Sequence, residues 1–145
     1  MHTRDLIQRF KEHSEKIAFI WQDREYSYDW LFKSCEKWIT ELDTHGVNAG
    51  SVVAVSSDYS PFSVALFYAL MDRGCVFVPL TSSVMAKHEQ FMDIAEARYL
   101  IRFDTPEHWI IEDRSVATTS EILRRLTEER LPGLILFSSG STGES

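Results

Sequence analysis

The sequence has few cysteines and no excess of basic residues. Its two cysteines, Cys35 and Cys75, are too few for a disulfide framework and lack metal-binding spacing, so we expect free thiols in a reducing compartment, the cytoplasm. Only 15 Lys and Arg stand against 22 Asp and Glu, which gives a net charge of −7. This balance argues against a general nucleic-acid or anionic-membrane binder, but it permits a local anion site.

Long hydrophobic runs are also missing. The most apolar stretch, residues 61–80, is interrupted by Asp72, Arg73 and Gly74, whereas a membrane-spanning helix needs about 20 predominantly apolar residues. No apolar run follows the first five residues, as it would in a secretory signal. We therefore expect neither a membrane span nor a secretory leader.

The length and composition predict one globular unit. The 145 residues are 44% hydrophobic and 26% charged, which is close to the average for folded domains. A chain of this size can bury roughly 68–70% of its unfolded surface. Because no internal repeat or Pro/Gly-rich linker marks a boundary, we expect a single unit over residues 1–145.

Strand-like and helix-like segments alternate along this unit. Leu31, Cys35 and Trp38 recur at three- and four-residue steps, which predicts a helix from about Asp29. The short β-branched run 52–55 predicts a buried strand. Further elements are expected at 6–10 (helix), 17–21 with 25–28 (hairpin), 61–73 (helix, with Ser60 as cap and Gly74 as stop), 75–78 (strand), 87–97 (helix), 99–102 and 109–111 (strands), 119–130 (helix) and 133–137 (strand).

This alternation predicts an α/β fold, a layered and largely parallel sheet with helices on both faces. In such sheets, ligands bind beyond the carboxyl ends of the strands. The last predicted strand runs directly into a loop of small residues: Ser138, Ser139, Gly140, Ser141, Thr142 and Gly143. Glycines let backbone N–H groups turn toward an anion, and the hydroxyls add donors or ligands for phosphate-bound Mg²⁺. By composition alone, a flexible Ser/Gly loop is the alternative.

Three familiar loop motifs do not fit this segment. A Walker loop needs four residues between its glycines and a following lysine, whereas the two glycines here stand three positions apart with no lysine after them. The dinucleotide fingerprint is absent from the segment. A nucleophile elbow needs Gly-x-Ser-x-Gly, but residues 139–143 begin with serine.

Residues 135–145, ILFSSGSTGES, instead resemble the phosphate loop of the adenylate-forming ligases, which include acyl-CoA synthetases, luciferases and nonribosomal peptide synthetase adenylation domains. The basic residue of that signature would come after Ser145. Three upstream segments resemble structural motifs of the same family in the same order: 26–31 (YSYDWL), 46–55 (GVNAGSVVAV) and 70–80 (LMDRGCVFVPL). They depart from the family pattern at Trp30, Ser51 and Arg73. The resemblance runs from about residue 17 to the end.

The resemblance implies a two-step reaction. A carboxylate attacks the α-phosphate of ATP, bound with Mg²⁺, to give an acyl-adenylate and pyrophosphate, and a thiol of coenzyme A or of a carrier phosphopantetheine then takes the acyl group. Ser138 to Gly143 would grip the β- and γ-phosphates, while Glu144 is interpreted as solvated surface. The resemblance assigns no catalytic residue and no metal ligand to these 145 residues.

In the family, the carboxylate pocket, the nucleoside contacts and the C-terminal domain with its catalytic lysine follow this loop. The chain is therefore interpreted as a partial N-terminal subdomain that ends in the phosphate loop and is inactive by itself. Its expected partners are the remainder of the enzyme and a carboxylic acid substrate, with self-association through exposed apolar surface. The alternatives are a docking or assembly module derived from this fold and a flavodoxin-like binder of a phosphate ligand.

Two other residue types are interpreted as structural. The four tryptophans, Trp21, Trp30, Trp38 and Trp109, are expected in the core or in an interface, because no basic residues interleave them as single-stranded nucleic-acid binding requires. The histidines lack metal-ligand spacing and are expected on the surface or at helix ends: His2, His13, His45, His88 and His108.

Overall fold

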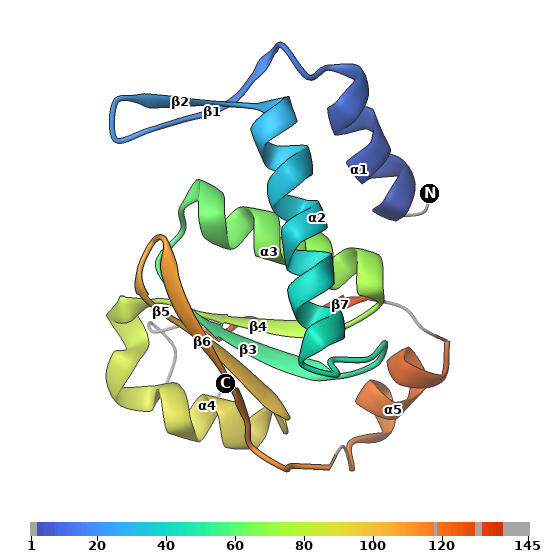
Figure 1. Ribbon diagram of the computed structural model, residues 1–145. Helices are drawn as coiled ribbons and strands as arrows, with labels where there is room; N and C mark the ends of the chain where they lie inside the picture. Colours follow the sequence, from blue (N-terminus) through green and yellow to red (C-terminus); the bar gives the residue numbers. More distant parts are fainter. Residues whose placement is uncertain (1–2, 118, 130–131, 138–145) are drawn as a thin grey trace.

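The computed structural model describes residues 3–117, 119–129 and 132–137. A five-stranded sheet in the order β6-β5-β3-β4-β7 forms its centre (Figure 1). β3 lies parallel to β4 and to β5, β4 lies parallel to β7, and β6 pairs antiparallel with β5 at one edge. The strands are β3 (Val52–Ser56), β4 (Val76–Leu80), β5 (Tyr99–Thr105), β6 (His108–Asp113) and β7 (Gly133–Leu134).

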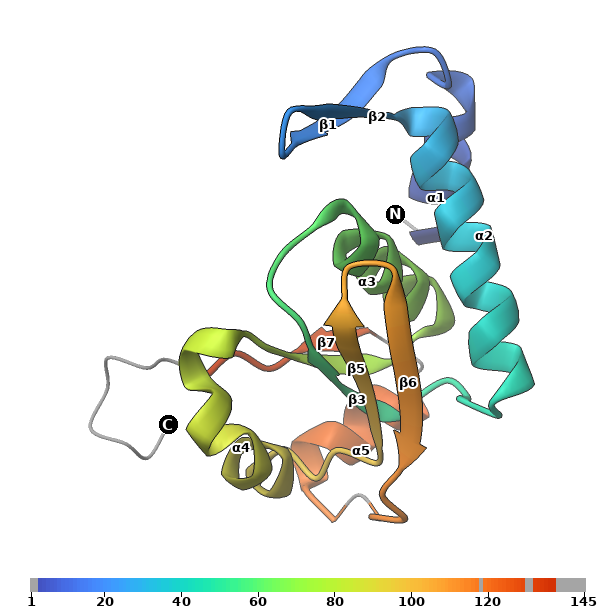
Figure 2. The same ribbon diagram turned by 60° about the vertical axis from the view of Figure 1, so that its left-hand side comes forward.

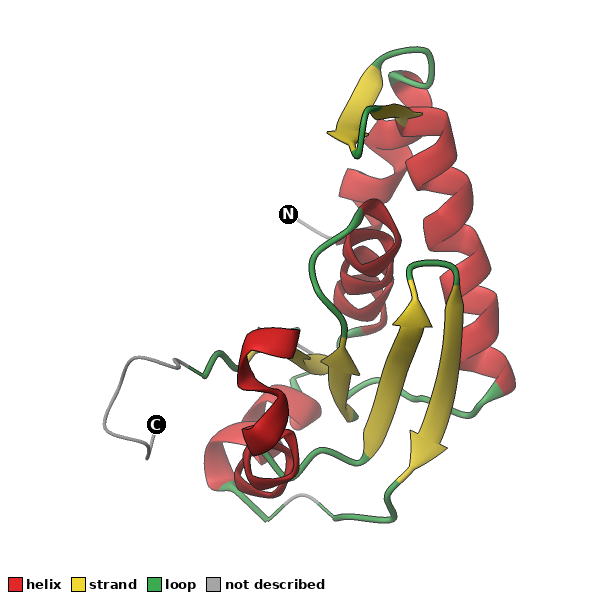
Figure 3. Ribbon diagram, turned by 90° about the vertical axis from the view of Figure 1, so that its left-hand side faces the viewer, coloured by secondary structure: helices red, strands yellow, loops and turns green. Residues whose placement is uncertain are grey.

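Helices lie on both sides of this sheet, which confirms the predicted fold class (Figures 1 and 3). One side carries α1 (Thr3–Glu12), α2 (Tyr28–Thr44) and α3 (Pro61–Arg73). The other side carries the 3₁₀ helix η1 (Ser82–Lys87), α4 (His88–Ile94) and α5 (Glu121–Glu128).

The predicted hairpin, β1 (Ile17–Trp21) and β2 (Arg24–Ser27), stands apart from the central sheet beside the start of α2 (Figure 2). Its two-residue loop, Gln22 and Asp23, has φ angles of 51° and 62°. Positive φ at both loop residues is typical of the type I′ turn, whose twist matches that of paired strands. Ser27 ends the hairpin and caps α2, because its Oγ accepts a hydrogen bond from the Trp30 N–H at 3.1 Å.

The predicted start and stop of α3 are both confirmed. Ser60 Oγ accepts from the Ser63 N–H at 3.2 Å, and Ser63 Oγ accepts from the Ser60 N–H at 3.0 Å, so the two serines form a reciprocal capping box. Pro61 occupies the first turn, where its missing N–H costs nothing. Gly74 ends the helix with a φ of 77°, a conformation that side-chain-bearing residues rarely adopt.

The core has two layers because strand side chains alternate between the faces of the sheet. Val53 and Val55 pack in the layer under α1, α2 and α3, whereas Val52 and Ala54 pack in the layer that faces α4. The first layer contains 17 buried residues and the second contains 10. The described part of the fold is therefore more deeply covered on the α1–α3 side.

The predicted helix over 87–97 is shorter in the structure, where α4 ends at Ile94. Glu96 adopts a φ of 55°, and the Ala97 N–H donates to the Met92 carbonyl at 3.0 Å. This is a Schellman-type stop in which glutamate occupies the position that glycine usually holds, so the sequence contains no glycine signal for it. The last predicted strand, 133–137, pairs in the β ladder only at Gly133–Leu134.

Cys35 and Cys75 are both buried, and they are present as thiols and not as a disulfide. Burial raises the pKa of the Cys75 thiol to about 12, which keeps it protonated and unreactive at neutral pH. Within the described ranges, no helix is both long enough and apolar enough to cross a membrane.

Candidate functional site

The predicted phosphate-binding residues, Ser138 to Gly143, lie outside the described residues. The segment that leads to them is described. β7 continues into a hydrogen bond from the Ile135 N–H to the Phe77 carbonyl, 3.0 Å long. The ring of Phe137 then stacks on that of Phe91 in α4, with centroids 4.2 Å apart and planes 8° from parallel. The backbone therefore reaches Ser138 from a fixed position.

Register places this position at the carboxyl edge of the parallel strands. Val76 pairs with Gly133 and Phe77 pairs with Leu134, and Phe137 follows three residues after this pairing ends. β3 also ends here, since Ser56 pairs with Leu80. Three parallel strands thus point their carboxyl ends at one edge, where open α/β sheets bind their ligands.

The loops after β3 and β4 are joined at this edge by one carboxylate. Asp58 accepts a hydrogen bond from the Ser82 N–H at 2.8 Å, and Ser82 Oγ lies 2.9 and 2.8 Å from its two oxygens. These donors lower the pKa of Asp58, with the backbone N–H of Ser82 as the largest cause and its hydroxyl as the next. The Ser57 N–H also donates to the Leu80 carbonyl at 3.1 Å.

His88 makes a hydrogen bond to the loop that follows β4. Its Nε2 donates to the Thr81 carbonyl at 2.8 Å, and the residue is 8% exposed. His88 opens α4, so the helix-end role expected from the sequence is confirmed, although the side chain is buried. This hydrogen bond to a loop carbonyl gives His88 a structural role.

The carboxyl edge carries several hydroxyl groups and the carboxylate of Asp58, which is already hydrogen-bonded to Ser82. The Thr81 and Ser83 hydroxyl oxygens lie 2.8 Å apart, and Ser57 Oγ donates to the Asp58 carbonyl at 2.7 Å. Each of these hydroxyls can both donate and accept hydrogen bonds. Among the described residues, no three His, Cys, Asp or Glu side chains are grouped so that they could hold a metal.

Sequence reasoning missed the link between Asp58 and Ser82, which are 24 positions apart. A signal was present, because short polar clusters follow both strands directly, at 56–60 and at 81–83. Those clusters mark the same sheet edge only when the strands are known to be parallel neighbours.

The sequence matches the model of one protein family, described as AMP-binding enzyme, over residues 6–145. It is 29% identical to the nonribosomal peptide synthetase opaA of Aspergillus ustus over 92% of this chain and 4% of that protein. It is also 26% identical to 4-hydroxybutyrate–CoA ligase 1 of Metallosphaera sedula, over 88% of this chain and 23% of that ligase.

Solved structures agree with these sequence matches. The N-terminal subdomain of Klebsiella oxytoca NpsA, in complex with 3-hydroxyanthranilyl-AMSN, superposes with a TM-score of 0.69 at 26% identity. The match covers 96% of this chain and 37% of that structure. The chain thus spans well under half the length of these relatives.

Proposed function

Because the chain belongs to the AMP-binding enzyme family, in which it corresponds to an N-terminal portion of an adenylation domain, we propose that it contributes the phosphate-binding loop of an ATP-dependent carboxylate ligase. In this proposal, Ser138 to Gly143 hold the β- and γ-phosphates of ATP while a carboxylic acid attacks the α-phosphate. The products are an acyl-adenylate and pyrophosphate.

The observation that carries the proposal is the fixed approach to Ser138. Phe137 is held on Phe91 at the carboxyl edge of three parallel strands, and this edge is where this class of sheet binds ligands. Phosphoryl-group chemistry depends mainly on positioning and on charge neutralisation. Backbone N–H groups and hydroxyls supply such donors without net positive charge, which agrees with a chain of charge −7.

Mg²⁺ would accompany ATP and neutralise part of its phosphate charge. We assign no ligand of that ion to the described residues. The thiol acceptor in this proposal is coenzyme A or a carrier phosphopantetheine. Both fit the relatives, which include a nonribosomal peptide synthetase and a CoA ligase.

We further propose that residues 1–145 do not catalyse the reaction alone and act with the remainder of such an enzyme. The relatives are much longer than this chain, and in the family resemblance the carboxylate pocket and the nucleoside contacts come from segments that follow the phosphate loop. Leu134 and Leu136, which are 53% and 64% exposed, supply apolar surface for such contacts or for self-association.

Acid-dependent exchange of pyrophosphate into ATP tests this proposal. The exchange is to be measured with a panel of carboxylic acids, both for the 145-residue chain and for the product of the complete reading frame that carries it. We expect no exchange by the chain alone and acid-dependent exchange by the complete product. The variant Thr142→Ala should reduce the latter about tenfold or more, since it removes a donor to the phosphates; Thr40→Ala, in an exposed helix position far along the chain, is the matched control.

Exchange by the 145-residue chain would overturn the proposal that it is inactive alone. If the complete product activates no acid and forms no acyl hydroxamate, the ligase proposal itself fails. The docking or assembly module would then be the better account of the fold.

A further inference from the structure

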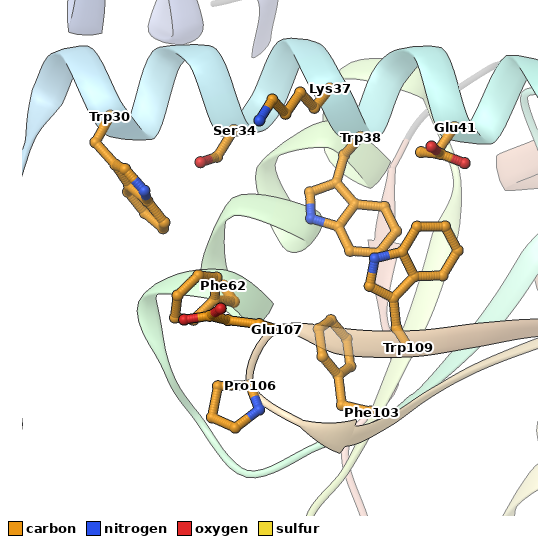
Figure 4. Close-up of a pocket in the computed structure, with 10 residues that line it drawn as sticks. All are labelled: Trp30, Ser34, Lys37, Trp38, Glu41, Phe62, Phe103, Pro106, Glu107 and Trp109. Carbon is orange, nitrogen blue, oxygen red and sulfur yellow. The ribbon is translucent and has the colours of Figure 1, made fainter.

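All four tryptophans of the sequence line one continuous groove, although they come from three separate elements. Trp30 and Trp38 project from α2, Trp109 comes from β6 and Trp21 ends β1. Three adjoining hollows of 340, 310 and 270 Å³ form the groove and share lining residues near the tip of the β5–β6 hairpin, among them Pro106. We call this surface the tryptophan groove. Figure 4 shows its first hollow, between α2 and that hairpin.

The rings that line the groove hold one another in place. Phe62, from α3, meets Trp30 edge to face at 5.3 Å and Trp21 at 6.3 Å between centroids. Trp38 and Trp109 lie 4.7 Å apart. Trp21, Trp30 and Trp109 are only partly buried. Rigid, partly exposed aromatic rings supply much contact area at little entropic cost, which is why tryptophan is enriched where proteins bind one another.

The charges along the groove are mainly negative. Glu41 lies at one end, Asp104 and Glu107 lie at the hairpin tip, and Asp58 lies at the other end. Two basic residues, Lys37 and Arg24, also line it. The Arg24 guanidinium already sits over the ring of Tyr26, 5.6 Å from its centroid. Phosphates and carboxylates would be repelled by this acidic excess, whereas a cation would gain from both the carboxylates and the ring faces.

We propose that the tryptophan groove binds an extended peptide segment of a partner protein, in which Lys or Arg side chains alternate with apolar residues. Three linked hollows fit a linear segment better than one compact molecule, and each hollow pairs aromatic rings with at least one carboxylate. The apolar residues pack on the rings, while the cationic heads reach the carboxylates. This inference is independent of the ligase proposal.

The four indole N–H signals in ¹H–¹⁵N spectra of the full chain report on this groove directly. The probes are two pools of short peptides, in which fixed Lys and Arg positions, or fixed Glu and Asp positions, alternate with a degenerate mixture of Pro, Leu, Val and Ala. We expect the basic pool to shift the indole signals saturably, and the acidic pool to leave them in place. Added salt should weaken the basic response.

A charge reversal at the hairpin tip separates the groove from general acidity. Glu107→Lys should weaken binding of the basic pool about fivefold to tenfold, since it replaces an attractive rim charge with a repulsive one. Glu112→Lys changes the net charge equally at an exposed β6 position that does not line the groove, and it should change binding less than about twofold.

Three outcomes would overturn the proposal. The basic pool could leave the indole signals unchanged at millimolar concentration, or shift them no more than the acidic pool does. Glu107→Lys and Glu112→Lys could weaken binding equally, which would show that the peptides respond to the net charge of the protein and not to the groove. Finally, indole shifts that depend on protein concentration without any peptide would assign the groove to a second copy of the chain.

Discussion

Among the residues whose side chains are described, α1, α2 and α3 cover a layer of 17 buried residues on one face of the sheet, whereas the layer facing α4 contains 10. The two layers also differ in what holds their connections. The helices α2 and α3 begin with serine caps, while η1 and α4 begin without a side-chain cap. On the α4 side, carboxylates tie the loops instead, with Asp58 on Ser82 and Glu96 on Thr119.

The two faces of the sheet are therefore stabilised by different interactions. Burial of apolar area, which does not depend on pH, dominates the α1–α3 face. A hydrogen bond to the ionised carboxylate of Asp58 holds the segments that frame the carboxyl edge, where the proposed ligand loop begins, and one to Glu96 holds Thr119 near the amino ends of β3 and β5. Elements with few buried contacts open first in native proteins and often frame ligand sites. The α4 face is therefore expected to be the more adaptable one.

Adjacent valines of β3 give the sharpest test of this contrast, because they share a strand and point to opposite faces. Val53 lies in the α1–α3 layer and Val52 lies in the α4 layer, with 0% and 1% exposure. We expect Val53→Ala to lower the free energy of unfolding by about 2–3 kcal/mol and Val52→Ala by about 1–2 kcal/mol, since a thinner layer relaxes more fully around a cavity. Urea unfolding with unchanged m-values measures both losses. Equal losses would contradict the contrast.

Helix caps supply a second, smaller test. Ser60→Ala removes the Oγ that accepts the Ser63 N–H, and it should cost about 1 kcal/mol of unfolding free energy. Thr81 occupies the corresponding position before η1 but makes no side-chain cap hydrogen bond. Thr81→Ala is therefore the matched control, with an expected loss of only a few tenths of a kcal/mol. If the two losses match, the caps do not distinguish the faces.

Acid should produce the smallest effect, and it should be largest on the α4 face. The pKa of Asp58 is lowered by hydrogen bonds from Ser82, and that of Glu96 is lowered chiefly by the Thr119 hydroxyl. A carboxyl whose pKa is lower in the folded state stabilises the fold above its ordinary pKa of about 4, and this contribution is lost as the pH falls through the folded-state pKa. Acid should therefore weaken both ties.

Amide hydrogen exchange, expressed as protection factors, locates this effect. Between neutral pH and about pH 3, protection should fall first in η1, α4 and the start of α5, while α2 and α3 keep theirs. Asp58→Asn combined with Glu96→Gln should reduce the difference, because these two titrating groups are gone. An equal loss of protection in α2 and α3 would show that acid acts on the whole fold.

Several elements of this fold were predictable from local sequence alone. The Ser60 cap, Pro61 and the Gly74 stop act within one or two helical turns, and the structure confirms all three. The early end of α4 was not predictable, because Glu96 adopts a left-handed conformation that sequence patterns reserve for glycine. For the candidate site, the loop from Ser138 to Gly143 carries a recognisable signature, but the position of Phe137, the residue before it, depends on pairing between β7 and β4.

The sequence by itself determined the alternation of strands and helices and the family to which the chain belongs. These features depend on residues within a few positions of one another, where periodicity, caps and motif order act. Only the tertiary structure decided the antiparallel edge strand β6, the tie between Asp58 and Ser82, and the gathering of four distant tryptophans in one groove. These features depend on how distant segments pack, because strand order and helix placement arise from burial over the whole core.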